Sequence, residues 1–238
     1  MHNDGAATNP AIAFDVYGTL VDPLQMNQRL RPLFGDIADR LAATWRQKQV
    51  EYAFRRGLMG RYEHFGVCTR QALQFALQSF GVELSEMEQE RLLDQYQNLP
   101  TFPDVIPGMR ALRTAGCKLA AFSNGVEATI RTLLNNAGAL PYLEQVISVD
   151  DVKTFKPAPK VYEYLVERLG TAKDVTWLVS SNAWDVIGAK SAGLQSAWIK
   201  RTADAVFDPW GIEPDIVVAD LNELATYFLR SAKPTNGR

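Results

Sequence analysis

Residues 11–22, which read AIAFDVYGTLVD, constrain the fold of this chain more than any other stretch. Residues 11–14 are too apolar to alternate in polarity, which is typical of a central strand in a parallel sheet covered on both faces. Asp15 ends this run, and Gly18 supplies a turn three residues later. Ligands bind at the carboxyl ends of strands in open α/β sheets. Asp15 is therefore a candidate site residue, although an Asp in this place caps a turn or helix about as often.

The composition indicates an ordinary globular protein. Of the 238 residues 47% are hydrophobic, and the formal net charge of -2 argues against a nucleic-acid partner held by charge. Cys68 and Cys117 stand far apart with no nearby pair of histidines, so neither a zinc site nor a redox motif is predicted. The first ten residues lack the pattern of a signal peptide, and no apolar run approaches the roughly 18 residues that a membrane helix needs. We expect a cytoplasmic protein without a membrane partner.

Helical patterns without strands fill residues 23–100. After a break at Gly35, Asp36 is a predicted N-cap, and Thr69 and Ser85 are predicted helix starts, the second of them with a capping box. Gly81 is a predicted C-cap between the last two helices. We therefore expect an all-helical cap domain over residues 23–100, inserted into a core domain made of residues 1–22 and 101–238.

From residue 107 onwards, strand and helix patterns alternate. Such alternation predicts βαβ units with right-handed crossovers and a mainly parallel sheet. Only residues 1–9 and 232–238 are expected to be loose. The strand patterns cover residues 117–122, 145–149, 175–180, 195–199 and 216–218, and the helix patterns cover 107–115, 159–169 and 221–229, with two more that end near Gly138 and Gly193.

Polar residues follow the predicted strands and repeat the arrangement at Asp15. Taken singly, Ser, Asn and Asp in such places are more often helix caps than catalysts. Carboxyl ends of parallel strands meet at one edge of a sheet, however, so four caps are a poor explanation. The residues concerned are Ser123, Asn124 and Gly125, then Asp150 and Lys156, then Ser180, Ser181, Asn182 and Asp185.

These residues resemble, in order and spacing, the four motifs of the haloacid dehalogenase superfamily. The resemblance spans nearly the whole chain and implies an α/β fold with a Rossmann-like, doubly wound core. It also implies that Asp15 is a nucleophile and that a helical cap is inserted after the first motif. The matching positions are Asp15 with Gly18, Thr19 and Leu20; Ser123 with Asn124 and Gly125; Lys156 with Pro157; and Ser180 to Asp185.

Two departures from the superfamily's phosphatases are informative. Those enzymes carry a second Asp two residues after the nucleophile and acids in the fourth motif that help to hold magnesium, whereas this chain has Tyr17 and Ser180 there. Mg²⁺ prefers near-octahedral oxygen ligands, so we expect no functional metal site and no cofactor. Halide leaves without needing a proton, which makes Tyr17 tolerable in place of a general acid.

The cap carries a second resemblance. WRQKQVEYAF at residues 45–54 is similar to the arginine-bearing segment of type II L-2-haloacid dehalogenases, and FKPAPKVY and SSNAWD at residues 155–162 and 180–185 resemble the same branch. The resemblance implies catalytic roles for Asp15, Thr19, Arg46, Ser123, Lys156, Tyr162, Ser180, Asn182 and Asp185. It implies substrate contacts for Val16, Tyr17, Gln47, Val50, Phe65, Ser123, Asn124 and Trp184, and halide binding by Arg46 and Asn124.

Some of these positions also have simpler interpretations. Without the resemblance, Arg46 would be expected to form a surface ion pair with an acid such as Glu51. Val50, Phe65 and Trp184 would be expected to pack in the core or between the domains.

The chemistry of these residues is consistent with dehalogenation. An ionised carboxylate at Asp15 can displace halide and form an ester that water then opens. Lys156 could supply the opposing charge that keeps Asp15 ionised, and Thr19 and Ser123 could orient it. Asp185 is the candidate base for water, because the two histidines lie in the N-terminal tail and on the cap.

The sequence therefore predicts a hydrolytic dehalogenase. It would convert short-chain L-2-haloacids such as haloacetate and L-2-chloropropionate to 2-hydroxy acids with inversion, with only substrate and water as partners. The alternatives are a magnesium-dependent small-molecule phosphatase of the same superfamily and a non-catalytic binding protein on this fold. Apolar Leu58 and Met59 on the cap allow the homodimer that family precedent favours, or they could simply pack the cap.

Overall fold

The computed structural model describes residues 9–231, in which the chain forms a six-stranded parallel sheet in the order β3-β2-β1-β4-β5-β6. This is the order of a doubly wound Rossmann-like sheet, so the predicted fold class is confirmed. Of the ends predicted to be loose, all but Asn9 lie outside the described residues. The strands are β1 (Ala11–Phe14), β2 (Lys118–Ser123), β3 (Gln145–Ser148), β4 (Thr176–Ser180), β5 (Gln195–Ile199) and β6 (Ile216–Val218).

β1 lies at the centre of the sheet, as its apolar sequence predicts. It pairs in parallel with β2 and β4, and all four of its residues are buried. Phe14 is in register with Ala121 and Val179, and the amide of Asp15 continues the ladder with a 3.0 Å bond to the Val179 carbonyl. This register brings the first residues after β1 level with the end of β4.

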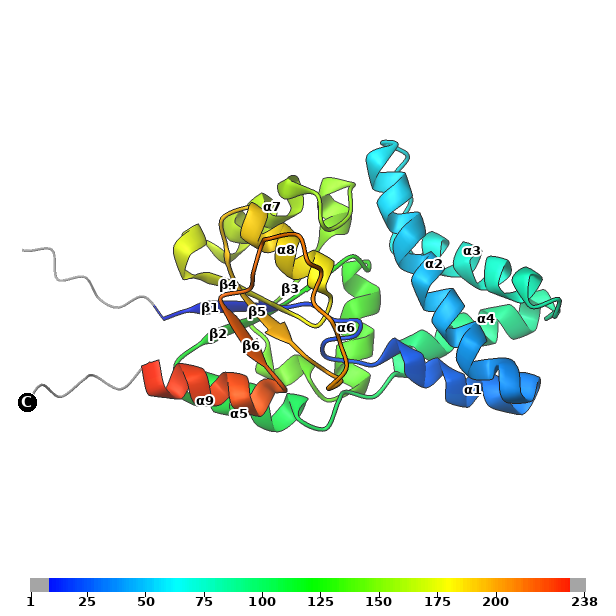
Figure 1. Ribbon diagram of the computed structural model, residues 1–238, viewed down its shortest axis with the longest axis horizontal. Coiled ribbons are helices and arrows are strands. Elements are labelled where there is room, and N and C mark those ends of the chain that lie inside the picture. Colours follow the sequence, from blue (N-terminus) through cyan, green and yellow to red (C-terminus); the bar gives the residue numbers. More distant parts are fainter. Residues whose placement is uncertain (1–8, 232–238) are drawn as a thin grey trace, which may run out of the picture.

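Helices cover both faces of the sheet. Figure 1 shows α7 and α8 above the strands and α5 and α9 below them, while α6 packs against β3. The core helices are α5 (Val105–Thr114), α6 (Glu127–Asn136), α7 (Pro159–Leu169), α8 (Ala183–Ser191) and α9 (Leu221–Ser231), with short 3₁₀ turns η4 (Leu140–Tyr142), η5 (Val149–Val152) and η6 (Lys173–Val175).

The helical elements between β1 and α5 lie within the predicted insertion, residues 23–100, which we call the cap. The cap stands at the right in Figure 1, on the side where β1 ends. Its interior is continuous with that of the core, because buried residues such as Trp45 and Leu73 belong to the same apolar cluster as Phe14. The cap contains η1 (Pro23–Gln25), α1 (Met26–Phe34), η2 (Gly35–Ile37), α2 (Ala38–Leu58), α3 (Phe65–Ser79), α4 (Glu86–Gln95) and η3 (Tyr96–Asn98).

The two links between cap and core run side by side. Val21 forms an antiparallel bridge with Thr101, and the amide of Phe102 donates to the Leu20 carbonyl at 3.0 Å. The chain thus enters and leaves the cap at one place.

A partly buried ion pair holds this junction against the core. The guanidinium of Arg201, which follows β5, donates to the Asp104 carboxylate at 2.7 Å and to the Thr19 carbonyl at 2.5 Å. The other oxygen of Asp104 caps α9 by accepting from the Leu221 amide at 2.8 Å. The links are therefore tied to the loop that follows Asp15.

Some predicted element boundaries were wrong and others are confirmed. Asp36 lies in a 3₁₀ turn and α2 begins at Ala38, so Asp36 is not its N-cap. Thr69 lies inside α3, where its hydroxyl donates to the Phe65 carbonyl one turn earlier, a bond that competes with the capping role. The capping box at Ser85 is confirmed.

Smaller differences affect the ends of other elements. α5 begins at Val105, two residues before the predicted start, and β3 ends at Ser148 because Val149 opens a 3₁₀ turn. Gly81 follows the end of α3 with a φ of 64°, as predicted for a C-cap. Within the described part of the chain, no helix is both long and apolar enough to cross a membrane.

We expect Gly108→Ala to destabilise the core. α5 packs so closely on α9 that a Cβ atom on Gly108 would lie 2.8 Å from the backbone carbonyl carbon of Leu221. Such overpacking costs about 1–3 kcal/mol, measurable as a lower urea midpoint. Gly57→Ala on α2 is the matched control, because its nearest new contact is 3.6 Å and Ala favours a helix. Equal midpoints for the two variants would contradict this packing.

Candidate active site

The Asp15 carboxylate lies at the carboxyl end of β1 and is 6% exposed. Three donors converge on its Oδ2 atom: the Asn182 amide at 2.7 Å, the Thr19 hydroxyl at 3.0 Å and the Ser180 hydroxyl at 3.3 Å. Lys156 Nζ donates to Oδ1 at 3.1 Å. The carboxylate is thereby fixed in orientation and stabilised as an anion by residues from three separate motifs.

The Lys156 ammonium is fully buried and links the ends of β1 and β2 to the first turn of α8. Besides Asp15, it donates to Asp185 Oδ2 at 2.9 Å and to the Phe122 carbonyl at 2.8 Å, which uses all three of its hydrogens. Burial acts to lower the pKa of Lys156, but the charges of Asp15 and Asp185 outweigh it and raise that pKa. Lys156 is therefore a permanent cation between two carboxylates.

Asp185, in the first turn of α8, is completely buried. Tyr162 on α7 donates its hydroxyl to Asp185 Oδ1 at 2.7 Å, while Lys156 contacts the other oxygen. Burial raises the pKa of Asp185 to about 6, against the lowering effect of Lys156. A carboxylate with such a pKa is ionised at neutral pH and is a stronger base than an ordinary Asp.

Ser123 and Asn124 lie at the end of β2, beside Asp15. The Ser123 hydroxyl accepts from the Gly125 amide at 3.1 Å, and Asn124 Oδ1 accepts from the Lys156 amide at 3.0 Å. These bonds fix the turn after β2 against the segment that carries Lys156.

Arg46 reaches from α2 of the cap to the core. Its guanidinium donates to the Tyr17 carbonyl at 3.2 Å and to Gln49 Oε1 at 2.8 Å. The expected alternative, a surface ion pair with Glu51, does not form, because Glu51 pairs with Lys48 and Arg55. Burial lowers the pKa of Arg46, but an Arg stays charged in proteins.

Eight residues line a small pocket at this edge, of about 10 Å³, which is close to the volume that one water molecule needs. One half of its wall is polar and the other is apolar or aromatic. The polar half comprises Asp15, Arg46, Ser123 and Asn124, and the other half comprises Tyr17, Val50, Phe65 and Trp184.

Two predicted substrate contacts do not line this pocket. Val16 is fully buried, and its carbonyl accepts from the amides of Leu20 and Val21. Gln47 is exposed on α2, so the structure does not bring it to the site.

Sequence reasoning missed Gln49 and Tyr96. Gln49 is fully buried; it accepts from Arg46 and donates to the Thr69 hydroxyl at 2.7 Å. Its position three residues after Arg46, on the same helix face, was the available signal. Tyr96 packs edge-on against Tyr17 with ring centroids 6.1 Å apart, and nothing in its local sequence indicates this contact.

A family model described as haloacid dehalogenase-like hydrolase matches residues 10–193. The chain belongs to this family. Its match covers all four strand-end motifs, which the fold has brought around Asp15.

Relatives of this haloacid dehalogenase-like hydrolase identify its branch. A (S)-2-haloacid dehalogenase of Pseudomonas putida is 37% identical over 92% of this chain and 96% of its own length. A haloacetate dehalogenase of Moraxella sp. (strain B) is 40% identical over 87% of this chain and 92% of its own length. A solved L-2-haloacid dehalogenase from Xanthobacter autotrophicus, with chloropropionic acid covalently bound, has a TM-score of 0.86 and 32% identity over 92% of this chain and 97% of that one. The predicted L-2-haloacid dehalogenase branch is confirmed.

We expect Lys156→Met to destabilise the hydrolase by about 3–5 kcal/mol near pH 8, because two buried carboxylates lose their counter-charge. The loss of this cation raises the pKa of Asp185 further. A carboxyl whose folded pKa is raised destabilises the fold at every pH above its ordinary pKa of 3.8, and does so fully above the raised pKa. Part of the lost stability should therefore return as the pH falls towards about 5. Urea unfolding at both pH values measures this.

Lys153→Met is the matched control, because this neighbouring lysine is 64% exposed and forms a surface ion pair with Asp150. Its loss should change stability by no more than about 0.5 kcal/mol at either pH. A Lys156→Met loss that is the same at both pH values would contradict the electrostatic explanation.

Proposed function

We propose that this chain is a hydrolytic dehalogenase that converts short-chain L-2-haloacids, such as haloacetate and L-2-chloropropionate, to 2-hydroxy acids with inversion. One observation carries the proposal: the buried Asp15 carboxylate, held by Lys156 at 3.1 Å, lines a small pocket that Arg46 also lines. The three relatives described above support the substrate class, and the covalently bound chloropropionic acid in one of them supports an ester route.

In the first step, an oxygen of Asp15 attacks C2 of the haloacid in line with the carbon–halogen bond. The new C–O bond forms an ester, and the bonding electrons leave with the halide. The departing anion gains its charge next to Arg46 and Asn124, which line the same pocket. The single displacement at carbon inverts C2.

The substrate carboxylate needs its own position in this pocket. Ser123 and Asn124 at the end of β2 support such a position, because both line the pocket and both are nearly buried. The apolar half of the wall, formed by Tyr17, Val50, Phe65 and Trp184, then receives the substituent on C2.

In the second step, water attacks the side-chain carbonyl carbon of the Asp15 ester. Asp185 takes a proton from this water and passes it to the oxygen of the leaving 2-hydroxy acid as the ester bond breaks. The Asp15 carboxyl formed in this way releases a proton to solvent, which restores the carboxylate. No bond to C2 breaks in this step, so the inverted configuration is kept. Lys156 contacts both carboxyl groups and stays charged throughout.

The two steps are linked through charge. The negative charge of Asp15 is one of the causes that raise the pKa of Asp185. Esterification removes that charge, so Asp185 holds its proton less tightly in the ester intermediate than in the free enzyme. It is therefore ionised when the base is needed.

A magnesium-dependent phosphatase is the enzymatic alternative, but the donor set does not fit the metal. Hydrogen-bond donors already converge on Asp15 Oδ2, and the Asn182 amide spans Asp15 Oδ2 and the Tyr17 carbonyl at 2.7 and 3.1 Å. A metal ligand must present a lone pair, which an amide N–H does not. Among residues 9–231, no three His, Cys, Asp or Glu side chains gather as a metal site.

The remaining predictions form part of this proposal. A cytoplasmic location is consistent with the free thiols of Cys68 and Cys117. A homodimer is consistent with Leu58 and Met59 at the end of α2, which are 89% and 64% exposed. The domain boundary at residues 22–23 and 100–101 agrees with the paired links between core and cap.

Halide release from the two enantiomers of 2-chloropropionate tests the function. We expect turnover of the L enantiomer alone, unchanged by chelator, with the D-2-hydroxy acid as product. Asp15→Asn is the control, because an amide lacks the nucleophilic anion while keeping the shape. Magnesium-dependent hydrolysis of para-nitrophenyl phosphate without halide release would support the phosphatase, and turnover of neither substrate would support a binding protein.

The same enzyme tests the ester route in a single turnover in heavy-oxygen water with enzyme in excess. We expect the label in the peptide that carries Asp15, because water attacks the side-chain carbonyl. Label in the product alone would mean that water attacks C2 directly.

We expect Tyr162→Phe to shift the pH dependence of ester hydrolysis upward. Asp185 acts as a base only when ionised, so the wild-type rate should fall on acidification with an apparent pKa at or below about 6. The Tyr162 hydroxyl favours the ionised form, and its loss raises the pKa of Asp185. Decay of the ester, followed by mass spectrometry across pH, measures the shift.

Tyr164→Phe is the control, since that hydroxyl contacts the surface residues Asp151 and Arg168. The same pH profile in both variants would remove Tyr162 from this role.

A further inference from the structure

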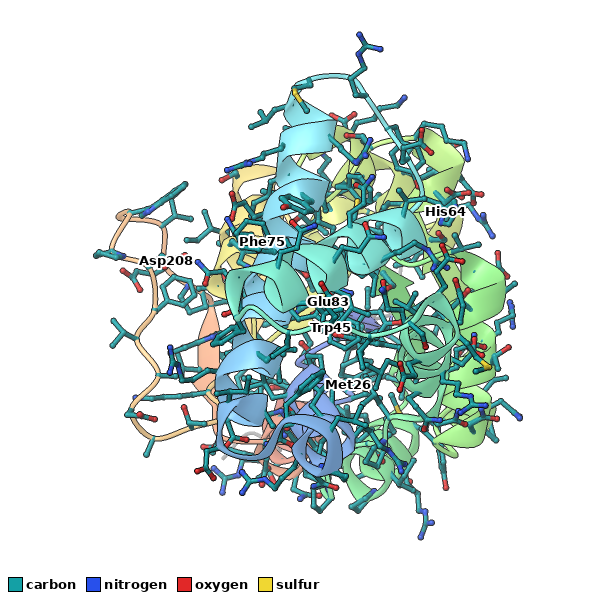
Figure 2. All side chains as sticks on the ribbon, turned by 90° about the vertical axis from the view of Figure 1, so that its right-hand side faces the viewer. Met26, Trp45, His64, Phe75, Glu83 and Asp208 are labelled. Atoms are coloured by element: carbon teal, nitrogen blue, oxygen red, sulfur yellow. The ribbon has the colours of Figure 1, made fainter. Side chains whose placement is uncertain are left out.

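A second cavity, of about 550 Å³, lies beside the small pocket. The cap supplies most of its wall through α3, α4 and η3, and the core closes it with the turn and first residues of α6. We call this cavity the groove. Figure 2 looks onto the cap and labels His64, which directly precedes α3 and lines the groove. The volume falls within the range of about 300–1,000 Å³ that small-molecule sites occupy. The chemistry described above does not use it.

Tyr17 and Phe65 are the only residues, within the described part of the chain, that line both cavities. Their rings lie 6.0 Å apart at an angle of 34°, and both side chains are nearly buried. Tyr96, which lines only the groove, packs edge-on against the Tyr17 ring. An aromatic partition therefore separates the catalytic pocket from the groove.

The Phe65 side of the partition is anchored to the site. The Phe65 carbonyl accepts from the Thr69 hydroxyl at 2.9 Å, Thr69 accepts from Gln49 at 2.7 Å, and Gln49 accepts from Arg46 at 2.8 Å. This chain of hydrogen bonds fixes the first turn of α3 relative to the guanidinium. The position of Phe65 in the partition is therefore tied to that of Arg46.

The groove offers the space that the catalytic pocket lacks. The catalytic pocket, of about 10 Å³, must widen even for the shortest haloacid, whereas the groove of about 550 Å³ already has room for several methylene groups. The C2 substituent of a haloacid should face the apolar wall, and two of the four residues of that wall are Tyr17 and Phe65. A longer substituent would have to pass the partition to reach the groove.

We propose that Phe65, with Tyr17, determines chain-length specificity by separating the catalytic pocket from a groove that can hold the alkyl chain of longer 2-haloacids. The proposal rests on the proposed function. Phe65 is the better position to test. The backbone carbonyl of Tyr17 accepts from Arg46 and Asn182, so a backbone shift caused by a substitution at Tyr17 would also move these two side chains.

The test compares kcat/KM for L-2-bromohexanoate and L-2-bromopropionate. Phe65→Ala should raise the ratio of long to short substrate by at least about tenfold, since even one methylene in an apolar pocket is worth that much. Val50→Ala is the matched control: Val50 lines the catalytic pocket and not the groove, so the same ratio should rise by less than about threefold. Phe65→Leu, which keeps more of the packing, should fall between wild type and Phe65→Ala.

A second variant locates the bound chain. Val67 on α3 lines the groove and not the catalytic pocket. Val67→Trp, added to Phe65→Ala, should cancel the gain on the long substrate and leave turnover of the short one unchanged.

Equal gains in Phe65→Ala and Val50→Ala, or no effect of Val67→Trp, would overturn the proposal. Wild-type turnover of L-2-chloropropionate distinguishes a failure of the partition proposal from a failure of the proposed function. If the wild type releases halide and the ratios do not move, the partition is wrong and the proposed function stands. If the wild type releases none, the proposed function itself fails.

Discussion

The ammonium of Lys156 is the group on which the site depends. Two carboxylates buried side by side repel each other and lose hydration, a cost that only a cation with good hydrogen bonds offsets. Lys156 meets this condition because its three hydrogens all go to acceptors, on Asp15, Asp185 and Phe122. The same bonds tie the ends of β1 and β2 to the first turn of α8. One buried charge thus compensates both carboxylates and fixes the geometry of the sheet edge.

The cap completes this edge from the other side. Arg46 on α2 bonds to the Tyr17 carbonyl of the core, and Phe54 on the same helix packs edge-on against Trp184 with centroids 5.1 Å apart. Further along, the Tyr62 hydroxyl donates to Asp150 at 2.5 Å. In the proposed reaction the core supplies the nucleophile Asp15 and the base Asp185, while the cap supplies Arg46 and two of the four apolar wall residues, Val50 and Phe65. Both segments therefore contribute to the pocket, and neither forms it alone.

The sequence was most informative where a residue's role depends on its distance from a strand end. Asp15, Ser180 and Asp185 could be placed because the alternating patterns located β1 and β4 within a residue. It was least informative on the cap. Gln47 and Gln49 differ by two positions on α2, so one is exposed and the other buried, and only the packing of α2 on α3 decides which. The aromatic partition escaped prediction because Phe65 and Tyr17 meet only after the cap has folded onto the core.

The side-by-side links between core and cap have a consequence for how such a protein can evolve. Because Val21 pairs with Thr101, the two chain connections between cap and core lie together. A segment whose two ends lie together can be lengthened, shortened or replaced without moving the strand ends around Asp15, Lys156 and Asp185. Such a replacement would keep these core residues but remove Arg46 and the cap's share of the pocket wall, so a new cap would have to bring its own cation and its own wall.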